Sequence, residues 1–198
     1  MSKSLIVITL GILVAALVLA PAPAHAQNWY ELNGHVGGFR YDIEDSDTDV
    51  LLGARMMLQY GSGWAWGGNF DWVNVDRDVG GTGIDIDLYL YSLGIEYMFP
   101  SASQFRFFGA AGAGAATGRV SDLPPAFPDD DESKTHLLVP LGVGFKWYND
   151  PVLSRASWAI RGDVRDNIIF VGDESVIFGD EDEAKNNFEF SGGISFLF

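Results

Sequence analysis

Apolar and polar residues alternate with a period of two through most of the chain, and this pattern limits the possible folds more than any other feature. In residues 50–60, for example, Val50, Leu52 and Met56 alternate with polar residues that include Arg55 and Gln59. Comparable runs cover residues 30–36, 64–72, 89–97, 105–117, 135–148, 155–170 and 188–198. A period of two is typical of β-strands with one apolar and one polar face. The sequence therefore predicts an all-β fold with eight strands.

The N-terminal 26 residues have the pattern of a secretion signal rather than of a strand. A single Lys3 precedes the uncharged apolar run 5–20, and residues 24–26 read Ala-His-Ala, a small-x-small cleavage pattern. We interpret residues 1–26 as a Sec signal peptide and 27–198 as one barrel domain. A membrane anchor is the alternative, because the run approaches the ~17 residues of the shortest spanning helices. No cysteine follows the run, which excludes lipoprotein processing.

Composition excludes several other classes of protein. The chain has 12 Lys and Arg against 27 Asp and Glu, a formal charge of -15, whereas nucleic-acid binding needs a basic surface. The absence of cysteine excludes a disulfide scaffold and a Cys-ligated metal site. No second long apolar stretch follows residue 26, which excludes a helical membrane protein.

The connections between the predicted strands are of two kinds. Residues 61–63, 100–104 and 149–154 are short, whereas 42–49, 73–87, 118–134 and 171–185 are long and contain 20 of the 27 acidic residues. Antiparallel up-and-down strands place alternate connections at opposite ends. The acidic residues should therefore gather at one end of the molecule.

Two eight-stranded barrels fit this pattern, and they differ in which face of the strands points outward. An outer-membrane barrel has short turns at one end, long loops at the other and aromatic girdles, and closure leaves no unpaired edge in lipid. A soluble barrel of the lipocalin kind would instead place its apolar face inward around a ligand. The aromatic content, the signal peptide and the C-terminus favour an eight-stranded antiparallel up-and-down transmembrane β-barrel, with short periplasmic turns and long acidic extracellular loops.

The C-terminal strand carries a more specific signal. Ser191, Gly193, Phe196 and Phe198 resemble the outer-membrane assembly signal, in which polar, Gly and hydrophobic residues at fixed spacing precede a terminal aromatic. Residues 28–198 as a whole resemble the small OmpA/OmpX-type outer-membrane barrels, without the peptidoglycan-binding domain of OmpA. The resemblance implies an integral, monomeric protein of the bacterial outer membrane. Its expected partners are outer-membrane lipid, lipopolysaccharide and, through the C-terminal strand, the outer-membrane assembly machinery.

If the apolar face contacts lipid, the opposite face fills the lumen. The candidate lumen residues are Glu31, Asn33, His35, Arg55, Gln59, Asn69, Asp71, Glu96, Arg106, His136, Lys146, Arg161, Asp163, Arg165 and Glu189. Acidic residues and Lys or Arg are equally numerous in this set, so their charges can pair. Eight strands leave room only for side chains, and a paired network is tolerated where isolated buried charges are not. We therefore expect a lumen filled by ion pairs; a proton or ion path through the same network is the alternative.

Three local motifs have features in common with known ligand sites. Residues 45–49 imitate the start of an EF-hand, but Val50 and Met56 stand where Gly and Glu are needed. The glycine run 109–118 continues a strand pattern and lacks the helix of a phosphate-binding loop. The acidic blocks 129–132 (Asp129, Asp130, Asp131, Glu132) and 180–183 are typical of solvated loops. Loose cation contact there, bridging to lipopolysaccharide phosphates, is the functional alternative.

Three functions remain open from the sequence. The first is a structural or surface-interaction role through the acidic loops. The second is a narrow conduit for small or hydrophobic solutes, as in OmpW-like barrels. The third is a lipid-modifying enzyme, which would need a nucleophile with a positioned base, but no serine forms a recognisable pair with His35 or His136. We expect neither enzyme activity nor a cofactor.

Overall fold

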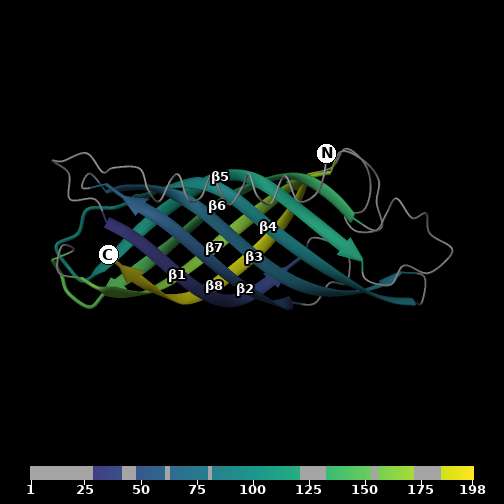
Figure 1. Ribbon diagram of the computed structural model, residues 1–198, viewed down its shortest axis with the longest axis horizontal. Helices are drawn as coiled ribbons and strands as arrows, with labels where there is room; N and C mark the ends of the chain where they lie inside the picture. The colour runs from purple at the N-terminus through teal and green to yellow at the C-terminus, as the bar shows by residue number, and fades with distance from the viewer. Residues whose placement is uncertain are drawn as a thin grey trace.

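The chain forms a closed barrel of eight antiparallel strands (Figure 1). The computed structural model describes residues 29–41, 48–60, 63–79, 82–120, 133–152, 156–171 and 184–198. The strands are β1 (Trp29–Arg40), β2 (Thr48–Gln59), β3 (Trp64–Val79), β4 (Thr82–Met98), β5 (Phe105–Val120), β6 (Ser133–Tyr148), β7 (Trp158–Phe170) and β8 (Ala184–Leu197). The predicted signal peptide, residues 1–26, lies outside these residues.

Each strand pairs with its neighbours in the sequence, and β1 pairs with β8 to close the barrel. The closing register runs from Glu31 opposite Leu197 to Arg40 opposite Phe188. This topology confirms the predicted eight-stranded antiparallel barrel. Within the described residues, no helix has the length and apolar character needed to cross a membrane.

Short connections and long connections lie at opposite ends. The turns after β2, β4 and β6 lie at the same end as the start of β1 and the C-terminus, as Figure 1 shows for the C-terminus. We call this the turn end and the opposite end the loop end. At the turn end, Gly63 adopts a positive φ of 88°, a conformation that glycine reaches without the steric cost that other residues incur.

One connection differs from the sequence prediction. Residues 73–87 were expected to form a long acidic loop, but β3 and β4 continue their pairing as far as Val79 opposite Thr82. The expectation of a loop was wrong because acidic residues alternate with valine and isoleucine here. The period-two pattern of a strand therefore continues through this segment despite its charge. The other long connections are also shortened, since β2 begins at Thr48, β5 ends at Val120 and β8 begins at Ala184.

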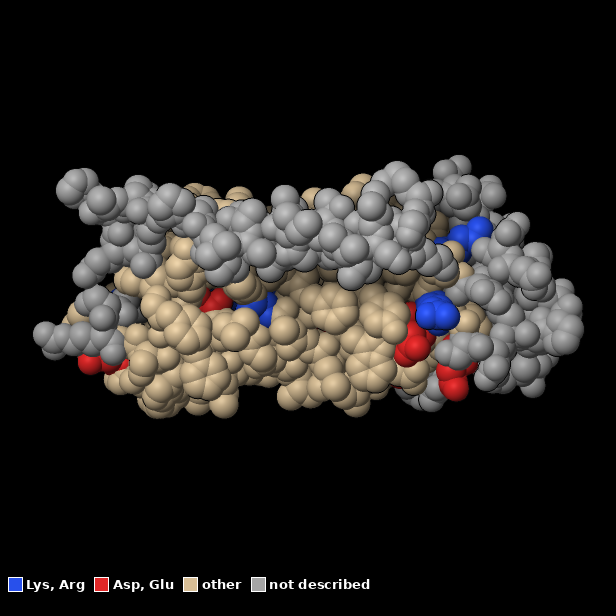
Figure 2. All heavy atoms as spheres, in the orientation of Figure 1, with Lys and Arg blue, Asp and Glu red and all other residues tan. Residues whose placement is uncertain are grey.

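Apolar side chains cover the outside of the barrel. The exposed large hydrophobic residues include Leu32, Val36, Leu52, Phe70, Leu93, Ile95, Leu141, Val143, Val164, Phe190 and Ile194. Figure 2 shows the resulting band between two ends where the coloured charges gather. Aromatic pairs border the turn end of this band, with ring centroids 4.8 Å apart for Trp64 and Tyr97 and 5.8 Å for Trp147 and Trp158. An apolar outer band with aromatic borders fits a membrane-spanning barrel and not the lipocalin arrangement.

The interior has three layers rather than one continuous charged filling. At the loop end, an apolar loop-end cluster consists of Phe39, Tyr41, Leu51, Val73, Val75, Ile86, Leu88, Leu90, Ala116, Val120, Leu138, Ile169 and Val171. At the turn end, a smaller turn-end cluster consists of Met98, Phe108, Tyr148, Ala159 and Leu197. Charged residues occupy the middle. The expectation that ion pairs fill the lumen was therefore incomplete, because inward-facing positions near both ends are apolar.

Candidate functional site in the barrel lumen

Four charged side chains form a compact network next to the turn-end cluster. Lys146 on β6 lies 2.6 Å from Glu31 on β1 and 2.5 Å from Glu96 on β4. Arg161 on β7 donates to Glu96 at 2.7 Å, and its guanidinium lies 4.1 Å from the centre of the Phe108 ring. None of these charged side chains is more than 2% exposed. The network therefore joins strands from opposite sides of the barrel.

Asp163 on β7 binds three arginines one layer further toward the loop end. Its carboxylate accepts from Arg161 Nε at 3.0 Å and from Arg165 Nε at 2.8 Å. Arg55 Nη1 on β2 lies 3.3 Å from the same carboxylate. Three guanidinium groups around one carboxylate give this layer a net positive charge. Arg161 also pairs with Glu96, and this second carboxylate offsets part of the surplus.

A third group of buried side chains lies between Asp163 and the loop-end cluster. His35 Nε2 lies 2.7 Å from Asp71 Oδ1, and His35 Nδ1 lies 3.0 Å from Asn33 Oδ1. Glu189 on β8 accepts from Asn167 at 3.0 Å and from Ser191 at 3.1 Å. All the polar side chains here are buried and hydrogen-bonded, as desolvated groups must be.

The wall formed by β3 to β6 has small residues at many of its inward positions, which leaves room in the lumen for long charged side chains. The inward positions of β3 to β6 include Gly67, Ser92, Gly94, Ala110, Gly112, Gly114, Gly142 and Gly144. A Cβ atom added at Gly142 would lie only 2.7 Å from Cγ of Arg165. Arg165 on β7 therefore occupies space that a side chain at Gly142, its neighbour on β6, would take.

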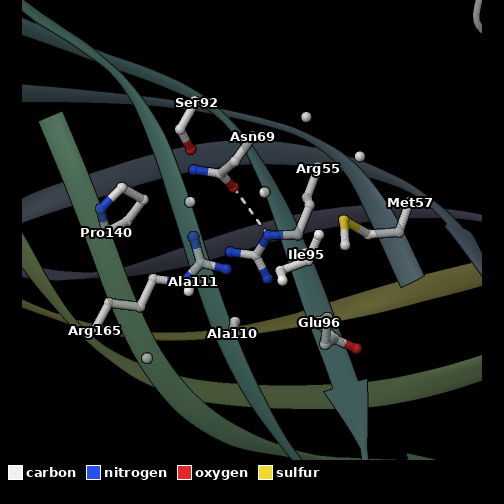
Figure 3. A pocket seen from close by; sticks show the side chains of 15 residues that line it. Arg55, Met57, Asn69, Ser92, Ile95, Glu96, Ala110, Ala111, Pro140 and Arg165 are labelled. Carbon is white, nitrogen blue, oxygen red and sulfur yellow. Dashed lines mark hydrogen bonds between the residues drawn. The ribbon is translucent and has the colours of Figure 1, made fainter. Parts of the chain in front are cut away.

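A small cavity remains against this wall (Figure 3), with a volume of about 30 Å³. Arg55 on β2 and Arg165 on β7 extend into it from the strands that flank this wall, near Asn69 and Ser92. The volume suffices for a water molecule but not for an organic solute. The loop-end cluster lies on one side of it along the barrel axis and the turn-end cluster on the other.

A groove on the outer surface approaches the same point of the wall. Tyr30, Leu58, Trp66, Phe70 and Leu93 are among its apolar lining residues. The groove and the inner cavity share the lining residues Arg55, Gly67, Gly68, Asn69 and Ser92. The groove and the cavity thus approach each other at β3 and its neighbours, where they share these lining residues.

Most candidate lumen residues lie in the middle layer, but three differ in position. Arg106 is only partly buried, lies at the turn end and donates to the carbonyl of Pro151 at 3.3 Å. Asn69 is also partly buried and accepts from Arg55 Nε at 2.9 Å. His136 is buried on β6, two residues before Leu138 of the loop-end cluster.

Sequence reasoning missed several buried polar residues and the apolar clusters. Asn167, Asn187 and Ser195 are buried, and Ser195 donates to Glu31 at 2.7 Å. Consecutive apolar residues such as 50–52, 137–139 and 168–171 mark the places where the alternation stops. Such runs are typical of strand segments that are covered on both faces, and they could have identified the loop-end cluster.

Three residues of the C-terminal assembly signal lie on β8 and Phe198 directly follows it; Ser191 and Gly193 face inward, and the two phenylalanines face outward. Ser191 is buried and binds Glu189, and Gly193 packs against His35, where an added Cβ would lie 2.7 Å from the histidine Cβ. Phe196 and Phe198 are exposed on the outer surface. The proposed cation contacts at residues 129–132 lie outside the described part of the chain.

The histidines of the lumen lack the neighbours of a hydrolase. His35 and Asp71 form a base-and-acid pair, but the second ring nitrogen faces the amide oxygen of Asn33 and not a serine hydroxyl. Nucleophilic catalysis would need that hydroxyl within hydrogen-bond reach.

Comparison with known proteins agrees with this geometry. Residues 12–196 match the family model of the outer membrane protein beta-barrel domain. No curated protein matches the chain. Solved structures with a similar fold include Neisserial surface protein A, at 12% identity and a TM-score of 0.57, with 86% of this chain and 97% of that chain covered.

Two further structures have the same fold. The attachment invasion locus protein Ail of Yersinia pestis is 14% identical with a TM-score of 0.56, over 86% of this chain and 98% of that chain. The N-terminal β-barrel domain of Pseudomonas aeruginosa OprF is 16% identical with a TM-score of 0.52, over 88% of this chain and 100% of that domain.

Proposed function

Because the chain belongs to the outer membrane protein β-barrel family, whose members lie in the bacterial outer membrane, we propose that it acts as a structural and surface-interaction protein through its acidic loop end. The observation that supports this role is the filled lumen. The loop-end cluster, the ion pairs of the middle layer and the turn-end cluster follow one another along the barrel axis. A barrel filled in this way leaves its two ends as the surfaces that meet partners outside the membrane.

The charge of the loop end indicates what kind of partner it would meet. Four segments at this end contain 20 of the 27 acidic residues. Ail of Yersinia pestis has been crystallised with a sulfated heparin analogue. A strongly acidic loop end would repel such a ligand. We propose instead that its carboxylates share divalent cations with the phosphates of neighbouring lipopolysaccharide, since carboxylate and phosphate oxygens are suitable ligands for Mg²⁺ and Ca²⁺.

Lipopolysaccharide retention tests this proposal. The full chain is purified from bilayers that contain lipopolysaccharide, with Mg²⁺ or with EDTA, and the lipopolysaccharide bound per chain is measured. We expect retention with Mg²⁺, loss with EDTA, and reduced retention when Asp129, Asp130 and Asp131 are replaced by Asn and Glu132 by Gln. Asp150→Asn, at the turn end, is the matched control. Retention that does not respond to EDTA or to these substitutions would contradict the proposal.

A narrow conduit is the second candidate, and the approach of the outer groove to the inner cavity at β3 and β4 favours it. The outer groove and the inner cavity share Gly67 and Gly68, so a small separation of these strands would connect lipid with the lumen. Planar-bilayer conductance and uptake of small apolar solutes into vesicles separate the two functions. If the chain has only the surface role, correctly folded protein should show neither conductance nor solute uptake. Measurable flux that falls in a Gly68→Leu variant would favour the conduit.

An enzymatic role receives less support. The related barrels are an attachment protein, a surface protein and the barrel domain of OprF, none of which is described as an enzyme. Unchanged lipid masses after incubation with the folded chain are expected. A mass change that disappears in His35→Ala or His136→Ala would overturn this.

A further inference from the structure

The buried charges of the described lumen do not balance. Its five buried carboxylates are Glu31, Asp71, Glu96, Asp163 and Glu189. Its four buried permanently cationic side chains are Arg55, Lys146, Arg161 and Arg165. One negative charge therefore has no Lys or Arg to offset it, in surroundings where an unpaired charge is costly.

The imbalance is concentrated in one place. The turn-side part of the network contains Glu31, Glu96 and Asp163 together with all four Lys and Arg residues, so it carries a surplus of one positive charge. The remaining carboxylates, Asp71 and Glu189, lie with His35 below the loop-end cluster. This group carries two negative charges when the imidazole is neutral, and the surplus of the turn-side part offsets only one of them.

His35, Asp71 and Glu189 are positioned as metal ligands would be. One donor atom from each of the three lies within 4.8 Å of the others, and all three side chains are buried. Zinc bonds of 2.0–2.2 Å place neighbouring ligand atoms about 3.4 Å apart in a tetrahedral site. Binding one ion would therefore need the Glu189 oxygen to approach by about 1 Å, and it would need His35 Nε2 and Asp71 Oδ1, now 2.7 Å apart, to separate by roughly 0.7 Å.

The surrounding residues orient these groups in the way that supports metal binding. In metal centres, a ligating histidine commonly donates its other ring N–H to an oxygen, and ligating carboxylates accept hydrogen bonds from their neighbours. Here Asn33 Oδ1 lies 3.0 Å from His35 Nδ1 and can accept its proton. Asn69 donates to the second oxygen of Asp71, and Asn167 donates to Glu189.

Gly53 keeps space open beside the group. A Cβ at this position would lie 2.1 Å from Asp71 Oδ1 and 2.3 Å from His35 Nε2. Both contacts are far inside van der Waals distance, so glycine is needed where the histidine and the carboxylate meet.

We propose that His35, Asp71 and Glu189 bind one divalent transition-metal ion in the lumen, with Zn²⁺ as the best match. One imidazole nitrogen and two carboxylate oxygens suit Zn²⁺, whereas Mg²⁺ and Ca²⁺ prefer all-oxygen sites. The ion offsets the two negative charges of the group. This inference does not depend on the proposed surface function. It predicts a structural ion, because the apolar cluster above and the ion pairs below separate the site from both ends.

The competing arrangement is an ion pair without metal. A doubly protonated His35 would donate to both Asn33 and Asp71 and would also restore neutrality to the buried set. The two arrangements differ in whether His35 Nε2 carries a proton or a metal ion. Metal content and the state of that nitrogen therefore distinguish them.

Refolding in the presence of metal provides the test, because the enclosed site should take up its ion as the barrel forms. The full chain is refolded from urea into detergent micelles with Zn²⁺, Co²⁺ or EDTA, and free ion is then removed. We expect about one retained ion per folded chain, measured by elemental analysis, and visible absorption bands of coordinated Co²⁺.

Conservative variants separate this site from adventitious binding. His35→Asn and Glu189→Gln should each lose the ion, whereas His136→Asn, at a buried histidine outside the group, should retain it. Gel mobility of unboiled samples confirms folding of each variant. The proposal is overturned if the folded wild-type chain retains no ion and ¹⁵N NMR shows both nitrogens of His35 protonated, or if both His35→Asn and Glu189→Gln retain the ion. Glu189→Gln keeps the test valid if His35→Asn does not fold.

Discussion

Replacing Arg161 by methionine would test how much the buried ion pairs stabilise the barrel. Arg161 donates to Glu96 at 2.7 Å and to Asp163 at 3.0 Å and is 1% exposed. Removing one member of a buried ion pair generally costs 3–5 kcal/mol because a charge is left without its partner. Glu96 keeps Lys146 at 2.5 Å, and Asp163 keeps Arg165 at 2.8 Å.

Each carboxylate thus retains one cation, so the cost should lie at the low end of that range, about 3 kcal/mol. This loss is equivalent to a decrease of roughly a hundredfold in the folding equilibrium constant. Adding Glu96→Gln to Arg161→Met removes the carboxylate that has lost one of its two cationic partners and should restore about 1–2 kcal/mol, so the two substitutions are not additive.

Urea unfolding of the chain in lipid vesicles, followed by tryptophan fluorescence and by gel mobility, measures these differences. Arg119→Met, which removes an exposed arginine from β5, is the control and should change the free energy of unfolding by less than about 0.5 kcal/mol. If Arg161→Met is no more destabilising than this control, or if its effect and that of Glu96→Gln simply add, the ion pairs do not stabilise the barrel in the way described.

Three further predictions concern packing, insertion and closure. Gly142→Leu should destabilise the barrel by about 1–3 kcal/mol through overlap with Arg165, whereas Gly34→Ala, whose added Cβ meets nothing within 4 Å, should be near neutral in the same urea assay. Phe198→Ser should lower the amount of protein assembled in the outer membrane without changing its export across the inner membrane; equal amounts in fractionated cells would argue against the terminal assembly signal. Unboiled protein should migrate differently from boiled protein on a denaturing gel, because the closed sheet resists detergent, and identical migration would count against closure.

The sequence predicted the number of strands, their alternation and the direction of each face, because lipid on one side and a narrow lumen on the other impose opposite chemistry on successive residues. Leu52 and Arg55 illustrate this, since they differ in parity and lie on opposite faces. The extent of the β3–β4 hairpin was missed. Its acidic residues suggested a loop, whereas backbone pairing depends on the partner strand and tolerates charge outside the membrane.

The candidate site was less predictable than the fold. Parity placed Glu31 and Lys146 in the lumen, but 115 residues separate them, and only the barrel closure brings them within 2.6 Å. The same applies to His35, Asp71 and Glu189, which come from β1, β3 and β8. Periodicity gives the face of each residue but not its height along the barrel axis or its partner across the lumen, because both depend on the register of all eight strands.

The path of the ion pairs across the lumen also constrains the order in which the barrel assembles. Glu31 belongs to the first strand, whereas its cationic partners Lys146 and Arg161 belong to the sixth and seventh. An open sheet that has not yet joined β1 to β8 must therefore keep these charges hydrated or expose them to lipid, and neither is compatible with a stable half-inserted state. Joining the first and last strands neutralises the charges in the same step that removes the sheet edges. Insertion and closure should consequently occur as one cooperative event, because the unpaired charges would destabilise any partly closed barrel in the membrane.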